Sequence, residues 1–267
     1  MIQSVSMMVQ VDYFERLGGK AIRKAESVRG IVALLVAALR RMPVLRRASI
    51  RPVLYRQIYF TGIEAFSIIA VMGVLIGIAI ITQVTNLAGL NPLLIGKILV
   101  WTVVRELGPI FAAIIIIARS SSAVASELGA MKAGKEIDRL WSMGIDPLEY
   151  LIVPRIAGSA LSLFILTFYF QVAAVAGGLV LSSLIVNTPI IPQLQGIFSV
   201  LGLFEMSISL VKSLVFGIVI GTVSCYHGLS VKQSITEIPQ VTSRAVLQSL
   251  TMMFVLNVVI TVFSFLW

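Results

Sequence analysis

Three charged residues lie in a stretch that is otherwise apolar enough to cross a bilayer. Arg105 and Glu106 fall near the middle of the apolar run 93–118, and Lys97 precedes them. At the centre of a span each charge costs roughly 2.5–3.5 kcal/mol on insertion scales, so such residues face protein or water rather than lipid tails. A buried ion pair that holds helices together and a site for a polar group inside the membrane are both compatible with this pattern.

Other reactive residue types are scarce. The single cysteine, Cys225, excludes an internal disulfide, and the single histidine, His227, argues against a metal site. The chain has no HExxH motif, no paired carboxylates, and no Ser–His or Cys–His set beyond isolated residues. It also lacks a GxxxxGK[ST] phosphate loop, so we expect no catalytic residues and no cofactor, with ATP and Mg held by a partner.

The composition is that of an integral membrane protein. Hydrophobic residues make up 58%, charged residues 12%, and the mean hydropathy is +1.00, whereas soluble domains carry about a quarter charged residues. The net charge of +9 would suggest nucleic acid in a soluble protein, but here the position of the charges matters more, and we expect no nucleic-acid partner. The first twenty residues predict neither a cleaved signal nor a transit peptide.

The apolar runs predict an all-α integral membrane protein with an N-terminal interfacial amphipathic helix and five transmembrane helices. Residues 1–56 form the N-terminal region, in which apolar residues from Val28 to Met42 recur at helical spacing between arginines. This helix lies in the cytoplasmic interface or packs on the protein's own membrane domain, and the two are compatible. The membrane domain is residues 57–267, with spans at about 62–84, 93–118, 156–186, 206–226 and 245–267.

Two pairs of glycines predict close helix packing, and one connection is predicted to be a loop. Gly73 and Gly77 lie in the first span, and Gly217 and Gly221 in the fourth. Small residues four apart let another helix approach closely. Pro189 and Pro192 mark residues 187–205 as a proline-bearing loop.

Orientation follows from the lysines and arginines outside the spans. Eleven lie before residue 57, five in the loop 119–155 and two in 227–244, whereas none lies in 86–92, in 187–205 or at the C-terminus. The positive-inside rule places the N-terminus and the two basic loops in the cytoplasm and the C-terminus outside.

The loop 119–155 reads as helical pieces interrupted by Gly129, Gly134 and Gly144. Lys135 to Met143 predicts a helix of about two turns, with Ile137, Leu140 and Trp141 on one side, Glu136 and Arg139 spaced i,i+3, and Gly144 as a C-cap. An exposed tryptophan on such a helix is typical of docking to a soluble partner. The alternative is that Trp141 packs on the membrane domain or lies among lipid headgroups.

The depths of the charges argue against a simple pairing of Glu106 with Lys212. Lys212 lies about six residues (~9 Å) from the outer end of its span, and Glu106 about 13 residues (~20 Å) from the outer end of its own. A direct Glu106–Lys212 pair requires helix tilt. The alternative is that Arg105 pairs with Glu106 of a second subunit. Since the side chains of adjacent helix residues point about 100° apart, Arg105 and Glu106 cannot both point directly at the same partner. We hypothesise a split of roles, in which Glu106 holds a helix contact near a dimer axis and Arg105 offers a fixed positive charge to a polar group inside the membrane.

Several long motifs occur in order along the chain: R-E-L-G-P (105–109), A-R-S-S-S-A-V-A-S-E-L-G-A-M (118–131), E-I-D-R-L-W-S-M-G-I-D-P (136–147), V-P-R (153–155), and the shorter R-Q-I-Y (56–59), G-V-L-I-G (73–77) and K-S-L-V-F-G (212–217). They resemble those of the MlaE (YrbE-type) permeases, the membrane subunits of ABC lipid transporters that work with MCE-domain proteins. The resemblance covers about residues 50–267.

This resemblance implies a homodimeric permease of the bacterial inner membrane that carries phospholipid and contributes to outer-membrane lipid homeostasis. Its partners would be a cytoplasmic ATPase dimer, an MCE-domain protein on the outer face and a small STAS-type accessory protein. The implied lipid-cavity residues are Arg105, Glu106, Gly108, Pro109, Gly73, Gly77 and Lys212. The implied ATPase-coupling residues are Glu127, Lys135, Glu136, Ile137, Asp138, Arg139, Leu140, Trp141 and Met143.

The alternative function is an ion- or proton-coupled transporter that uses Arg105, Glu106 and Lys212 as a charge relay. The chain shows no internal repeat, and five spans do not divide into equal halves, which argues against an inverted-repeat secondary transporter. An odd number of spans instead suggests that a homodimer completes the pathway.

Overall fold

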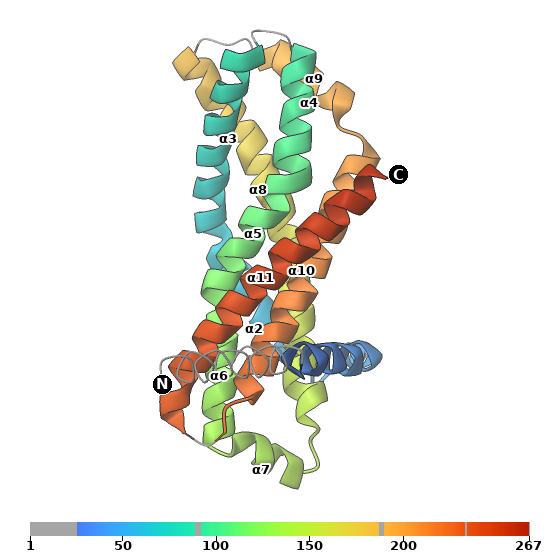
Figure 1. The fold of residues 1–267 in the computed structure, drawn as a ribbon, viewed down its shortest axis with the longest axis vertical. Coiled ribbons are helices and arrows are strands. Elements are labelled where there is room, and N and C mark those ends of the chain that lie inside the picture. The colour runs from blue at the N-terminus through green and yellow to red at the C-terminus, as the bar shows by residue number, and fades with distance from the viewer. Residues whose placement is uncertain (1–25, 89–91, 187–189, 233, 267) are drawn as a thin grey trace, which may run out of the picture.

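The computed structural model describes residues 26–88, 92–186, 190–232 and 234–266, and Figure 1 shows them as a tall bundle of long helices. The described residues contain five helical segments that are long and apolar enough to cross a membrane, which confirms the predicted all-α integral membrane fold. These segments run over Arg51–Asn86, Leu93–Ala133, Leu148–Leu181, Leu203–Leu229 and Ile235–Ser264.

Most spans are assembled from shorter helices. Their components are α2 (Arg51–Thr61) and α3 (Phe66–Ala88); α4 (Pro92–Leu99), α5 (Gly108–Ile116) and α6 (Ser122–Ala133); α8 (Val153–Val186); α10 (Leu203–Leu229); and α11 (Ile238–Phe265). Short 3-10 turns at Ile63–Ala65 and Ile235–Glu237 precede α3 and α11. Three π-helical segments, Val100–Leu107, Ile117–Ser121 and Leu148–Ile152, join the others. Since π-helical turns often occur at functional sites, the segment that holds Arg105 and Glu106 is of particular interest.

The N-terminal helix is confirmed over residues 26–40 and lies across one end of the bundle (Figure 1). Ile31 and Ala38 are buried, while Val32 and Leu39 are exposed, so one face packs on the protein and another remains apolar at the surface. The 3-10 turn Met42–Arg46 follows. Residues 1–25 lie outside the described part of the chain.

Ion pairs tie this N-terminal region to the segment that precedes α8. Arg41 pairs with Asp146, and Arg47 Nη1 lies 3.0 Å from Glu149 Oε2. The N-terminal region therefore packs on the protein's own membrane domain, and its position at the membrane interface stays a prediction.

Three of the predicted boundaries were wrong. Gly129 does not interrupt α6, because it is buried and a Cβ there would meet Val231 Cγ2 at 3.0 Å; the glycine serves close packing rather than a break. Residues 187–205 are not a plain loop, since they contain α9 (Ile190–Val200), and Pro192 lies in its first turn, where no intrahelical N–H is needed. The polar connection 227–244 is shorter than predicted, because α10 continues to Leu229 and α11 begins at Ile238.

The long helix α8 packs against both α3 and α10, and both predicted glycine pairs are confirmed as close-packing positions against it. A Cβ at Gly77 would lie 2.0 Å from the carbonyl oxygen of Ala174, and one at Gly217 would lie 2.5 Å from Ala160 Cα. No side chain fits at either position, so α3 and α10 approach α8 backbone to backbone.

Candidate functional site

The π-helical segment Val100–Leu107 meets α5 at Gly108 and Pro109, and this junction redirects backbone hydrogen bonds. The N–H of Gly108 donates to the carbonyl of Val103, five residues back, and Pro109 has no N–H to donate to Arg105. The carbonyl of Val104 accepts a bond from Gln171 Nε2 at 3.0 Å, and that of Arg105 accepts one from Lys212 Nζ at 3.5 Å. The Gly-Pro pair therefore exposes two carbonyls to side chains of α8 and α10.

Glu106 and Lys212 form the closest ion pair of this region. Lys212 Nζ lies 2.7 Å from Glu106 Oε1 and also donates to Thr261 Oγ1 at 2.8 Å. The hydroxyl of Thr261 lies 3.1 Å from Glu106 Oε2, and Asn257 Nδ2 lies 3.4 Å from the same oxygen. Glu106 thus joins the π-helical segment to α10 and α11 at once.

Arg105 points to a different set of partners. Its Nη1 lies 3.2 Å from Glu205 Oε2 in the first turn of α10, and its Nη2 lies 2.5 Å from Ser264 Oγ near the end of α11. Its guanidinium also lies over the ring of Trp101, 5.7 Å from the centroid. The prediction that the side chains of Arg105 and Glu106 cannot both point directly at the same partner is confirmed.

These residues make a charge cluster of Arg105, Glu106, Glu205 and Lys212. The side chains of Lys212 and Arg105 are 0% and 5% exposed, and those of Glu205 and Glu106 are 14% and 26% exposed. Two cations and two carboxylates balance, which is the condition for keeping charges inside an apolar bundle. Through these contacts the charge cluster joins the π-helical segment to α10 and α11.

Glu106 and Lys212 contact each other directly, although their distances from the outer ends of their spans predicted a mismatch in depth. The mismatch disappears because the outer ends of the spans do not all lie at one level. Figure 1 shows that α10 begins, and α11 ends, well below the far ends of α3 and α4, with α9 connecting the two levels. Lys212 is therefore brought to the level of Glu106 within a single chain.

Sequence reasoning missed Glu205, Gln171 and the three polar residues of α11. Asn257, Thr261 and Ser264 are spaced i, i+4 and i+7, which puts them on one helix face. That polar stripe in an apolar span was the signal that could have found them.

The other predicted cavity residues lie in different places. Gly108 and Pro109 adjoin the charge cluster, and a Cβ on Gly108 would lie 2.9 Å from Gln171 Cγ. Gly73 and Gly77 instead pack against α8, so the structure does not bring them to the cluster. Their role at a lipid cavity stays a prediction.

The predicted coupling helix is present as α7 (Glu136–Ser142), at the end of the bundle where the N-terminal helix lies (Figure 1). Lys135 precedes it with φ 57°, and Gly144 follows with φ 76°, the left-handed conformation expected of a C-capping glycine. Ile137 is buried and Leu140 half-buried, whereas Trp141 is 60% exposed. Ile137, Leu140 and Trp141 therefore differ in exposure, and the side chain of Trp141 lies at the surface of this chain.

Remaining coupling residues surround this helix. Asp138 Oδ1 lies 3.3 Å from Lys132 Nζ, and Glu136, Arg139 and Met143 are exposed. Glu127 lies on α6, where it pairs with Arg155 rather than with α7.

A bundle of five spans, a charge cluster within it and a short exposed helix between the second and third spans are typical of the membrane subunit of a transporter. The family model described as permease MlaE matches residues 54–263. The chain therefore belongs to the MlaE permease family of ABC transporter permeases.

Individual relatives agree with this assignment. A probable ABC transporter permease protein of Rickettsia typhi is 28% identical over 254 residues, covering 92% of this chain and 95% of that protein. Another from Synechocystis is 36% identical over 165 residues, covering 61% of this chain and 62% of that protein. The chloroplastic protein TRIGALACTOSYLDIACYLGLYCEROL 1 of Arabidopsis thaliana is 30% identical over 214 residues, covering 79% of this chain and 61% of that protein.

Proposed function

We propose that this permease moves phospholipid between the bacterial inner membrane and an MCE-domain protein on the outer face, and so contributes to outer-membrane lipid homeostasis. A relative named after a galactolipid, at 30% identity, supports lipid as the substrate class. The observation that carries the proposal is the Arg105–Glu205 pair, a guanidinium held by a carboxylate inside an apolar bundle.

The chemistry of that pair suits a lipid headgroup. Phosphate and carboxylate bind a guanidinium in the same two-oxygen geometry. A phosphate that arrives beside Arg105 can replace Glu205 without leaving the cation uncompensated. Glu205 lies in the first turn of α10, where the helix N-terminus stabilises the released carboxylate. Glu106 and Lys212 keep the helices braced during this exchange.

The proposed assembly is a homodimer with a separate ATPase dimer, an MCE-domain protein and a small STAS-type protein. Along α11, one side is exposed and apolar at Phe254, Val255, Val258 and Val262, and this helix lies on the outside of the bundle (Figure 1). A second copy of the chain would bury that surface. ATP and Mg would be bound by the ATPase, and the permease itself would need neither a cofactor nor a metal.

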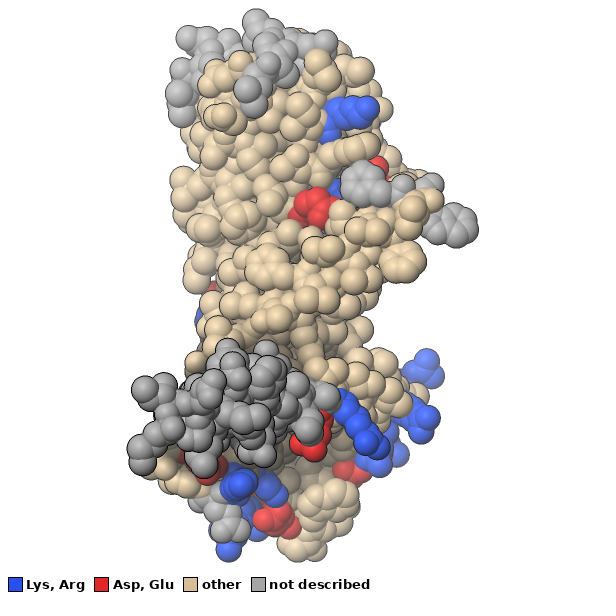
Figure 2. Space-filling view, in the orientation of Figure 1, with Lys and Arg blue, Asp and Glu red and all other residues tan. Residues whose placement is uncertain are grey.

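The proposed orientation places α7 in the cytoplasm. Figure 2 shows most of the visible lysines and arginines gathered at the end of the bundle that carries the N-terminal helix, while a few charged groups of both signs appear over the rest of this face. That distribution supports a cytoplasmic N-terminus and a periplasmic C-terminus in a multi-pass inner-membrane protein.

The charge-relay alternative uses the contacts of Arg105, Glu106 and Lys212 for ion or proton movement. Purification of the full complex separates the two functions. The lipid-transport proposal requires a stoichiometric ATPase and phospholipid in the mass spectrum of the purified complex. Recovery of an active permease with neither would support the relay instead.

A further inference from the structure

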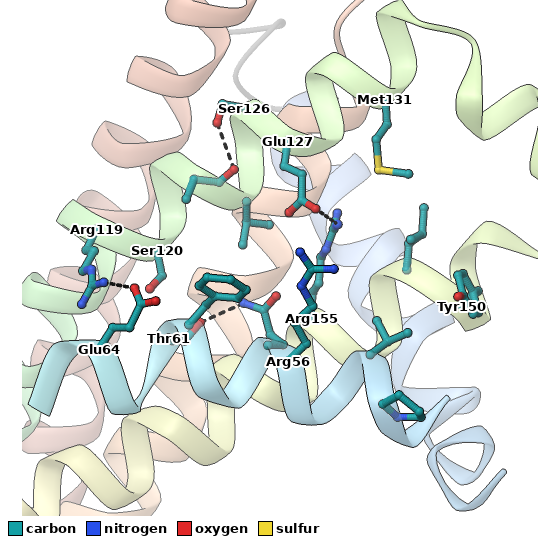
Figure 3. Close-up of a pocket in the computed structure, with 17 residues that line it drawn as sticks. Arg56, Thr61, Glu64, Arg119, Ser120, Ser126, Glu127, Met131, Tyr150 and Arg155 are labelled. Carbon is teal, nitrogen blue, oxygen red and sulfur yellow. Dashed lines mark hydrogen bonds and ion pairs between the residues drawn. The ribbon is translucent and has the colours of Figure 1, made fainter. Parts of the chain in front are cut away.

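A second charged region lies at the α7 end of the bundle, separate from the charge cluster. There α2, α6 and the start of α8 enclose a cavity of about 730 Å³, shown in Figure 3. Three arginines and two glutamates line it: Arg56, Arg119, Arg155, Glu64 and Glu127. The lining therefore carries one more positive than negative charge.

The five charges are not equally satisfied. Arg119 pairs with Glu64, and Arg155 Nη2 lies 3.1 Å from Glu127 Oε1. Arg155 is only 5% exposed, yet its Nη1 has no hydrogen-bond partner among the described residues. A buried guanidinium nitrogen with an unused donor calls for an oxygen acceptor in the cavity.

Arg56 supplies a second cation on the other side of the same space. It extends from α2 and lies over the ring of Phe60, 5.6 Å from the centroid. Figure 3 shows Arg56, Glu127 and Arg155 pointing toward the same part of the cavity. Two guanidiniums that converge on one space, with a single carboxylate between them, make a setting for an anion with several oxygens.

The cavity is also partly apolar. Phe60, Val124 and Leu151 contribute to its wall beside the arginines. Such a wall suits the glycerol backbone and first methylenes of a lipid, and the arginines can donate hydrogen bonds to a phosphate. We propose that this cavity binds a phosphate group, either on a phospholipid or free, with Arg56 and Arg155 as the donors.

This proposal does not depend on the charge cluster or on the transported lipid. Only the leaflet from which a phospholipid would come rests on the proposed orientation, which places the cavity on the cytoplasmic side. The result of a binding test in detergent, without ATPase or ATP, is therefore independent of whether the permease transports lipid.

The test uses the full chain in a phosphate-free detergent with Ser126→Cys as a reporter, because Ser126 lines the cavity. The native Cys225 is fully buried and supplies no background thiol. The rate of modification by a soluble maleimide is measured with dihexanoyl phosphatidylglycerol, dihexanoylglycerol or inorganic phosphate. Ser142→Cys, on the exposed surface of α7, reports any general effect of the additives on the reagent.

Phosphatidylglycerol should protect Ser126→Cys at concentrations at which dihexanoylglycerol does not. Arg56→Gln and Arg155→Gln should each raise the half-protecting concentration roughly tenfold, the effect of losing one charged hydrogen bond. Arg51→Gln, an exposed arginine of α2 outside the cavity, should leave it unchanged. Because Arg155 is buried and its variant can fail to fold, exposed Arg56 keeps the test decisive.

The source of the phosphate follows from the same titrations. Protection by inorganic phosphate at the concentration needed for phosphatidylglycerol would support the site with free phosphate as its ligand, and protection by the lipid alone would support a headgroup. Equal protection by dihexanoylglycerol, or an Arg56→Gln curve that coincides with wild type, would overturn the proposal.

Discussion

Lys212 Nζ and Glu106 Oε1 lie 2.7 Å apart, although the residues are 106 positions apart in the chain. The lysine side chain has no exposed surface and the glutamate is about a quarter exposed. The pair joins α10 to the π-helical segment, so the consequences of breaking it are those of a buried charge left alone.

Glu106→Ala should destabilise the purified permease by about 3–5 kcal/mol, because Lys212 would stay buried without its carboxylate. The measurement is the temperature at which the detergent-solubilised chain loses its monodisperse peak. Combining Glu106→Gln with Lys212→Met removes both charges at similar volume and should recover most of the loss. A Glu106→Ala protein as stable as wild type would show that the pair holds nothing together.

Gly77→Ala should destabilise the bundle by about 1–3 kcal/mol through overpacking, because the new Cβ would meet the carbonyl oxygen of Ala174 at 2.0 Å. The same thermal assay measures it. Gly202→Ala is the matched control, since the nearest atom to its Cβ would be 3.9 Å away. Equal stability of the two variants would mean that α3 and α8 can separate at no cost.

Composition and periodicity were sufficient to predict the five spans, because each helix must be apolar along a length set by the bilayer. The glycine pairs and the α7 cap were also predictable, since they rest on local geometry. The partners of Arg105 were not. These partners depend on the level at which α10 begins relative to the ends of α3 and α4. The difference in level comes from the insertion of α9, a segment that we predicted to be a loop because of its two prolines.

The same correction changes how topology should be tested. Gln193, in the predicted loop, is 2% exposed and would make a poor reporter, whereas Asn86 at the end of α3 is exposed. With Cys225→Ser as background, Asn86→Cys should react with an impermeant thiol reagent added to intact cells, and Lys232→Cys should not. The opposite labelling would place α7 on the wrong side of the membrane for an ATPase.

Combining Trp141→Ala with Glu136→Lys should release the ATPase from the purified complex. Loss of a buried aromatic anchor costs about 2 kcal/mol or more, and the lysine reverses a charge on the exposed surface of α7. Membrane insertion should be unaffected, as judged by yield. Tyr55→Ala, an exposed aromatic on α2, controls for general loss of surface area, and an intact complex with normal ATP hydrolysis would refute the coupling role of α7.

The central claim is that Arg105 can exchange its carboxylate partner for a lipid phosphate, and the amount of phospholipid bound per permease chain tests it most directly. Lipids are counted by mass spectrometry in wild type, in Arg105→Ala and in Lys97→Ala, a control for a cation of the same span that lies over Trp101. We predict that Arg105→Ala leaves the proposed dimer assembled but lowers phospholipid affinity roughly tenfold, as expected for one charged hydrogen bond, while Lys97→Ala leaves that affinity unchanged. Equal phospholipid occupancy in wild type and Arg105→Ala would contradict the exchange and leave Arg105 as a brace between helices.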